Sequence, residues 1–168
     1  MKRLQDEIEK AALQLNERLW SRGLTAATAE SCTGGGVAAA ITSIAGSSQG
    51  FKGGIVAYAN EVKQQVLGVR EETLLQYGAV SEHTVRQMVQ GVARLMRADY
   101  AVATSGVAGP GGGTPQKPVG MVWLAAGNEK EQVTKLLMME DKGRGENVSR
   151  AILEALRLLC EVVANGEK

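Results

Sequence analysis

Residues 24–44 read LTAATAESCTGGGVAAAITSI and pass from a strand pattern into a helix pattern. The first six are rich in small and β-branched residues and follow Gly23, which predicts a buried strand over 24–29. A turn over 30–33 comes next, and the run GGGVAAAITSI predicts a helix over 34–44 with small residues on every face. Small residues let a helix lie close to a sheet, so this segment indicates a strand covered by a helix, as in an α/β domain.

The same alternation continues in both directions along the chain. Apolar residues at steps of three and four predict a helix over 4–19 that stops at Gly23. After the opening segment we expect strands at 53–59, 100–104, 119–126 and 132–139, and helices at 60–67, 71–76, 82–96 and 148–163. The last two strands form a hairpin. The sequence therefore predicts an α/β fold, a single layered α/β/α domain with a mixed sheet spanning residues 1–168, and leaves the strand order open.

Composition excludes several classes of protein. The 168 residues are 44% hydrophobic and 22% charged, which is typical of a globular domain and excludes disordered and collagen-like chains. A net charge of +1 gives no electrostatic basis for nucleic-acid or membrane binding, so we expect neither partner. No apolar run approaches the ~20 residues that a membrane helix needs, and acidic residues near the N-terminus argue against a signal peptide. We expect a cytoplasmic protein.

Few residues suited to metal or disulfide chemistry are present. Cys32 and Cys160 are too few for a disulfide framework, and with His83 as the single histidine we expect no metal and no other cofactor. Neither a dinucleotide-binding fingerprint nor a P-loop is found. Alanine-rich helix faces can pack against a second copy, so we also expect a homo-oligomer, with a dimer as the first guess.

Three glycine-containing segments each include the carboxyl end of a predicted strand and the turn, helix or loop after it: AESCTGGG, GGIVAYANEVK and TSGVAGPGGGTPQKPVG. In the first, Ser31 would stand at a helix N-terminus whose free N–H groups stabilise a developing oxyanion, which suits a nucleophile. Ser31 or Thr33 as a plain helix cap is an equally good interpretation. Cys32 is a rival nucleophile, although a small buried apolar role suits it better.

A serine nucleophile needs a base. His83 lies early in a predicted helix and is more simply a solvated residue. Lys63 follows the predicted strand that ends near Tyr58, and a lysine acts as a base only if burial or a nearby cation lowers its pKa. From the spacing alone, a lysine on a helix is usually a surface residue.

The third segment carries six glycines between Gly106 and Gly120. Its N–H groups can form a concave cradle for a phosphate or a carboxylate. Arg144, just before the last predicted helix, is either a clamp on the same anion or a solvated loop charge.

Several colinear motifs together resemble one family. TAESCTGG with a downstream GSS, FxGGxVAYxNExKxxxLGV, YGAVSExxV and ADYAVATSGVAGPGGGTPxKPVGxVW are similar to the C-terminal domain of the CinA family, over about residues 24–123. That family includes stand-alone nicotinamide mononucleotide amidases. The resemblance implies hydrolysis of the carboxamide of a small nucleotide substrate, nicotinamide mononucleotide, without a metal or an organic cofactor.

Carried over by position, the resemblance implies Ser31 as the nucleophile, Lys63 as its base, and Tyr58 as a hydroxyl that assists proton transfer or holds the lysine. The expected substrate-binding residues are Thr33, Gly34, Ser48, Asn60, Thr104, Ser105, Gly106, Gly109 and Arg144. The family's Gly-Asp-Arg run is here Gly143-Arg144-Gly145, with Val148 four places after the arginine instead of three. The resemblance therefore leaves the position of Arg144 open. Two alternatives also remain, a non-catalytic nucleotide-binding paralogue and a serine amidase acting on another small amide.

Overall fold

The computed structural model describes residues 1–166, and its centre is a five-stranded sheet in the order β2-β1-β3-β4-β5. Strands β1 (Ala26–Glu30), β2 (Phe51–Val56) and β3 (Tyr100–Gly106) run parallel to one another. Strands β4 (Met121–Gly127) and β5 (Gln132–Met138) continue the sheet as an antiparallel hairpin. The mixed sheet predicted from the sequence is confirmed.

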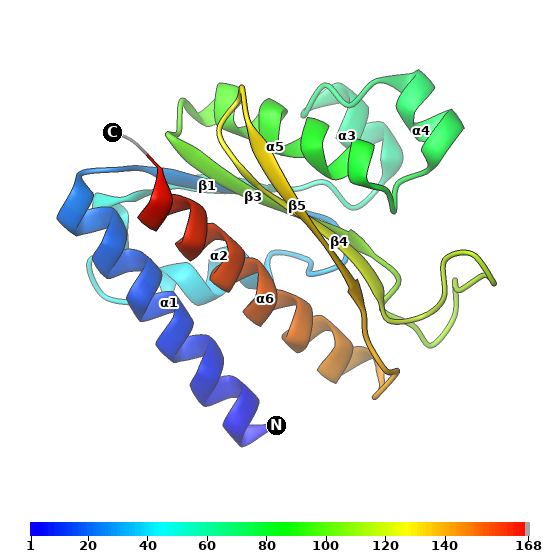
Figure 1. Cartoon of the computed structure of the whole chain (residues 1–168), viewed down its shortest axis with the longest axis horizontal. Coiled ribbons are helices and arrows are strands. Elements are labelled where there is room, and N and C mark those ends of the chain that lie inside the picture. The colour runs from blue at the N-terminus through cyan, green and yellow to red at the C-terminus, as the bar shows by residue number, and fades with distance from the viewer. Residues whose placement is uncertain (167–168) are drawn as a thin grey trace.

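Helices cover both faces of this sheet (Figure 1). The helices α1 (Lys2–Arg22), α2 (Gly36–Thr42) and α6 (Arg144–Asn165) lie on one face. The helices α3 (Asn60–Gln65), α4 (Glu71–Tyr77) and α5 (Glu82–Met96) lie on the other, and a 3-10 turn (Ser47–Gln49) precedes β2. The α/β/α layering is therefore confirmed, and among residues 1–166 no helix is both long and apolar enough to cross a bilayer.

Side chains along β1 alternate between two hydrophobic cores because successive residues of a strand point to opposite faces. Ala26 belongs to the core under α1 and α6, whereas Ala27 and Ala29 belong to the core under α5. The alternation continues past the end of the strand. Glu30 contacts α2 on the first face and Ser31 contacts α3 on the second.

The predicted elements are found; the helix predicted over 82–96 has the expected ends, whereas most of the others differ by a few residues. The first helix stops at Gly23, which has a φ of 61°, and Ser81 caps α5 by accepting a hydrogen bond from the Thr84 N–H. The second helix begins two residues later than predicted because Gly34 and Gly35 have φ values of 59° and 97°. The resulting turn separates Ser31 from α2.

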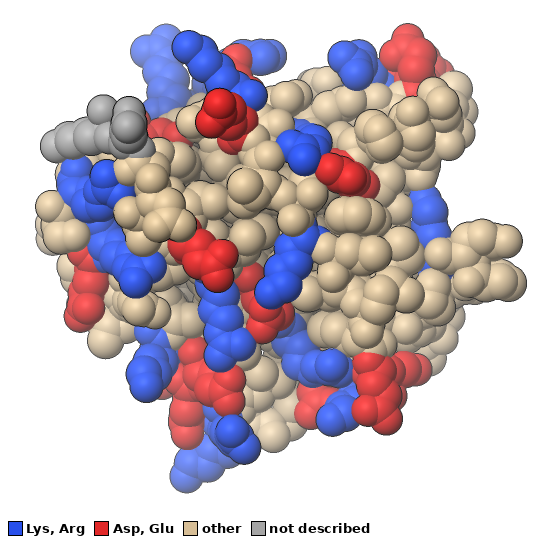
Figure 2. All heavy atoms as spheres, in the orientation of Figure 1, with Lys and Arg blue, Asp and Glu red and all other residues tan. Residues whose placement is uncertain are grey.

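Charged side chains of both signs are intermixed on the face shown in Figure 2. This agrees with the balance of 19 Lys and Arg against 18 Asp and Glu in the sequence.

Candidate active site

A pocket of about 330 Å³ lies at the carboxyl ends of the three parallel strands. Its wall comes from the turn after β1, the turn into α3, the residues before α5, the loop after β3 and the first residue of α6. The carboxyl ends of strands in an α/β sheet are the usual place for a ligand. A larger hollow of about 1160 Å³, between the β4–β5 turn and the end of α6, holds none of the site residues predicted from the sequence.

Ser31 and Lys63 meet in the wall of the smaller pocket. The Lys63 Nζ lies 3.0 Å from the Ser31 Oγ, 2.8 Å from the Ala57 carbonyl oxygen and 3.0 Å from the Tyr58 carbonyl oxygen. An ammonium can donate to all three oxygens, and a neutral amine can donate to the two carbonyls while it accepts from the serine hydroxyl. Both charge states of the lysine are therefore satisfied, and only the direction of the Ser31–Lys63 bond reverses.

Burial favours the neutral lysine. Lys63 is 1% exposed, and its burial lowers the pKa of the ammonium from the ordinary value, because the charged form loses hydration. For the neighbouring thiol the same cause acts in the opposite direction: burial, helped by the Glu30 charge, raises the pKa of Cys32 to about 11. Lys63 is thus no surface residue, and Ser31 has a base beside it while Cys32 stays protonated at neutral pH.

The short α3 explains how a lysine comes to be buried. Strand β2 ends at Val56, and residues 57–59 cross from the sheet to the helix. Helix α3 starts at Asn60, with Ala59 as its N-cap and no side-chain cap. The Lys63 N–H donates to Ala59 and its carbonyl accepts from Val69, which fixes the lysine backbone on both sides.

Tyr58 and Arg144 form the outer rim. Arg144 donates to the Tyr58 hydroxyl at 3.1 Å and to the Gly109 carbonyl at 2.7 Å. The arginine that the resemblance left open is therefore part of the pocket wall and joins three segments of it. Tyr58 holds Lys63 through its backbone carbonyl and not through its phenol.

The free helix N-terminus expected beside Ser31 is not there. The Glu30 carboxylate, 1% exposed, accepts from the N–H groups of Val37 (2.8 Å) and Ala38 (3.0 Å) at the start of α2. Sequence reasoning missed Glu30, and the signal available was a carboxylate directly after an apolar strand pattern, next to the candidate nucleophile. Within residues 1–166, the N–H groups of Ala108 and Gly109 donate no hydrogen bond, and both residues line the pocket.

The other predicted site residues divide into two groups. Asn60, Ser105, Gly106 and Gly109 line the pocket, whereas Thr33, Gly34, Ser48 and Thr104 do not. Thr33 and Thr104 are buried behind the Ser31 turn, and Ser48 is exposed just before β2, at the opposite end of the strands.

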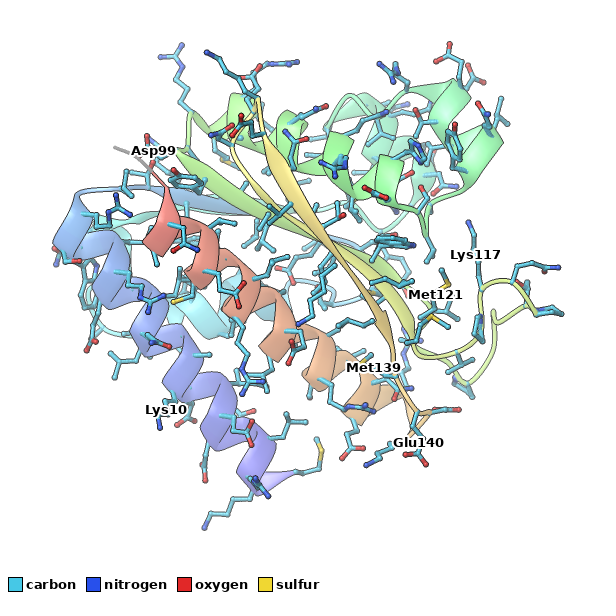
Figure 3. The ribbon with its side chains drawn as sticks, viewed as in Figure 1. Lys10, Asp99, Lys117, Met121, Met139 and Glu140 are labelled. Atoms are coloured by element: carbon cyan, nitrogen blue, oxygen red, sulfur yellow. The ribbon has the colours of Figure 1, made fainter. Side chains whose placement is uncertain are left out.

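Two further residues, His83 and Lys117, lie outside the pocket wall. His83 is exposed and stacks on Tyr77 with ring centroids 3.7 Å apart, outside the pocket wall. Lys117, labelled in Figure 3, projects from the loop after β3, and its ammonium donates to the Tyr77 carbonyl at the end of α4. Across the described part of the chain, no group of three or more His, Cys, Asp or Glu side chains is placed to hold a metal ion.

Comparisons with known proteins identify the family of this chain. The model of the CinA C-terminal domain matches residues 8–163. Nicotinamide-nucleotide amidohydrolase PncC of Escherichia coli K12 is 56% identical over 119 residues, which cover 71% of this chain and 72% of that protein. A CinA-like protein of Parasynechococcus marenigrum is 43% identical over 152 residues, which cover 90% of this chain and 36% of that longer protein.

Solved structures give the same result. The competence/damage inducible protein CihA of Agrobacterium tumefaciens matches with a TM-score of 0.90 and 42% identity, over 93% of this chain and 95% of that one. The competence damage-inducible protein A of Klebsiella pneumoniae matches with a TM-score of 0.91 and 37% identity, over 95% and 99% of the two chains. The chain therefore belongs to the CinA family, as a C-terminal domain of that family.

Proposed function

We propose that this chain hydrolyses the carboxamide of nicotinamide mononucleotide to nicotinic acid mononucleotide and ammonia. The similarity to the amidohydrolase PncC supports this substrate. The observation that carries the proposal is the 3.0 Å contact between the Ser31 Oγ and the buried Lys63 Nζ at a pocket wall. A serine with a lysine base is a recognised arrangement for acyl transfer.

The proposed reaction has two steps. Neutral Lys63 takes the hydroxyl proton of Ser31 while the serine oxygen bonds to the carboxamide carbon. The tetrahedral intermediate then breaks its carbon–nitrogen bond, and the nitrogen leaves as ammonia with a proton from the Lys63 ammonium. Water, deprotonated by the lysine, attacks the ester on Ser31 and releases the carboxylic acid, which restores the serine hydroxyl.

The pocket also offers groups for the charges of this reaction. The unused N–H groups of Ala108 and Gly109 are available to the oxyanion, in place of the α2 terminus that Glu30 occupies. Arg144 at the rim provides a cation for the phosphate of a mononucleotide. A volume of about 330 Å³ falls in the range of about 300–1,000 Å³ usual for small-ligand pockets.

The test is ammonia release from nicotinamide mononucleotide, with nicotinamide as the comparison substrate. We expect release from the mononucleotide and little from nicotinamide, since the latter lacks the phosphate. Ser31→Ala and Lys63→Met should each lower kcat by about a thousandfold or more while the protein stays folded.

The outcomes separate the proposal from its rivals. Tight binding of the mononucleotide without ammonia release would favour a non-catalytic nucleotide-binding protein. Release from another small amide, but not from the mononucleotide, would favour a serine amidase of different specificity. Full activity in folded Ser31→Ala would remove the serine from the mechanism.

A further inference from the structure

A buried chain of hydrogen bonds leads from the backbone of Ser31 to Glu30. The Ser31 N–H lies 3.3 Å from the Thr104 Oγ1, which lies 2.8 Å from the Thr33 Oγ1, which lies 2.6 Å from the Glu30 Oε1. All four residues are at most 8% exposed. The chain runs behind the pocket wall, so none of its links needs a ligand.

Counting protons fixes the direction of every link. The Glu30 carboxylate only accepts, so the Thr33 hydroxyl gives it its single proton. Thr33 then accepts from the Thr104 hydroxyl, and Thr104 accepts from the Ser31 N–H. Each donor polarises the next, as in other buried hydrogen-bond networks. All the hydrogen bonds therefore point the same way, from the Ser31 N–H to the Glu30 carboxylate.

Glu30 anchors this chain to a fixed element. Its two oxygens also accept from the Val37 and Ala38 N–H groups at the start of α2. One carboxylate thus joins the end of β1, the first turn of α2 and, through Thr104, strand β3. The glycine turn at 34–35 lies between Ser31 and α2 and gives the serine little rigidity of its own.

We propose that Glu30, Thr33 and Thr104 are positioning residues that hold the Ser31 Oγ against Lys63. The inference rests on the proposed role of Ser31 as the nucleophile. Thr33 and Thr104 were expected from the sequence to contact the substrate. In this proposal they lie behind Ser31 and position it. Because the Ser31 N–H is engaged in this chain and by the Thr104 carbonyl at 3.0 Å, the serine amide is not an oxyanion donor.

The test compares Thr33→Val and Thr104→Val, which remove a hydroxyl at constant shape, with Thr33→Ser and Thr104→Ser, which keep it. We expect the valine variants to lower kcat about ten- to hundredfold, because small displacements of a nucleophile have effects of that size. The KM for the mononucleotide and the pH at which Lys63 titrates should stay the same, since neither involves the chain. The serine variants should recover most of the lost kcat.

A second readout does not depend on the substrate. Phosphonylation of Ser31 by a small fluorophosphonate, followed by mass spectrometry of the Ser31 peptide, should slow in the valine variants by a factor similar to kcat. Thr42→Val is the matched control, because this exposed hydroxyl of α2 bonds only to the Ala38 and Ala39 carbonyls. Glu30→Gln should lower kcat less than the valine variants do, because an amide oxygen can still accept from Thr33 and Val37, and only the bond from the Ala38 N–H is lost to the amide nitrogen.

The two proposals fail in different ways. If the wild-type protein is phosphonylated at Ser31 but releases no ammonia from the mononucleotide, the proposed substrate is wrong. The phosphonylation rates of the variants would still test the positioning role of the hydrogen-bond chain. Folded valine variants with normal kcat and normal phosphonylation would overturn the positioning role. A rise in KM alone would also overturn it, because it would place Thr33 or Thr104 in contact with the ligand.

Discussion

Lys63 is the residue whose chemistry depends most on its surroundings. Its ammonium is surrounded by two carbonyl oxygens and a hydroxyl, with no carboxylate among its hydrogen-bond partners in the described chain. Carbonyls satisfy the amine in either charge state, whereas a carboxylate would hold it protonated. The environment thus leaves the lysine free to lose and regain a proton.

This predicts the pH dependence of the reaction. Because burial lowers the pKa of Lys63, the neutral base is present at lower pH than for a free lysine. The kcat/KM should rise with pH through an ascending limb whose midpoint lies below the ordinary pKa of lysine, and activity should fall as the pH drops through that midpoint. A profile of kcat/KM for nicotinamide mononucleotide measures it. Ascent only at the pKa of free lysine would contradict the role of Lys63.

Cys32 should be chemically quiet although it lines the pocket. With its pKa raised to about 11, only about a thousandth of the thiol is ionised at pH 8, and the thiolate is the reactive form. In a Cys160→Ser background, iodoacetamide should alkylate Cys32 far more slowly in the native protein than after denaturation. Cys32→Ala should keep most of the activity. Fast native alkylation would show that the thiol is activated.

The site residues were predictable in part. Local pattern indicated Ser31 at a strand-to-turn junction, but the spacing of Lys63 alone predicted a surface position, and only the family resemblance paired the two. The reason is physical: the burial of Lys63 is decided by how a six-residue helix packs, which its own sequence does not encode. The hydrogen bonds from the start of α2 to the Glu30 carboxylate are likewise tertiary contacts, which local sequence does not predict.

Among the elements, α5 packs against the segment that follows Lys63. Gly91 in this helix faces residue 67, at the end of the segment that follows Lys63, and a Cβ there would lie 1.8 Å from the Leu67 carbonyl oxygen. The helix thus packs directly on backbone. Such contact explains a glycine in the middle of a helix, where alanine is otherwise preferred.

Gly91→Ala should therefore destabilise the protein despite its better helix propensity. We expect a loss of about 1–3 kcal/mol in the free energy of unfolding, the usual result of overpacking. Gly145→Ala in α6 is the matched control, because nothing lies within 4 Å of its added Cβ. It should be neutral or stabilising. Urea unfolding of the two variants gives the comparison, and a stabilised Gly91→Ala would contradict the close packing.

Element types were read from the sequence more accurately than element ends. Strand β2 was expected over 53–59 and is found over Phe51–Val56, because residues 57–59 leave the sheet; there the Ala57 and Tyr58 carbonyls accept from the Lys63 Nζ. The apolar run GIVAYA hides that change of direction. The ends differ most where the chain turns toward the site.

At the scale of the whole molecule, the sheet separates the serine–lysine pair from the larger of the two hydrophobic cores. Helix α1 packs with α6 and α2 on one face (Figure 1), whereas Lys63 lies on the other face with α5. No residue of α1 lines the pocket. Stability and activity should therefore be separable through this helix.

Leu15 and Leu13 of α1 provide the matched pair for this test, since the former is fully buried and the latter is 43% exposed. Leu15→Ala should lower the free energy of unfolding by about 2–5 kcal/mol, because it leaves a cavity, and Leu13→Ala by about 0.5 kcal/mol or less. The kcat and KM of both variants, measured well below the unfolding temperature, should match those of the wild type. A fall in the kcat of folded Leu15→Ala would mean that a change in packing under α1 alters the position of Ser31 through β1. The two faces of the sheet would then be energetically coupled, and stability and activity would not be separable.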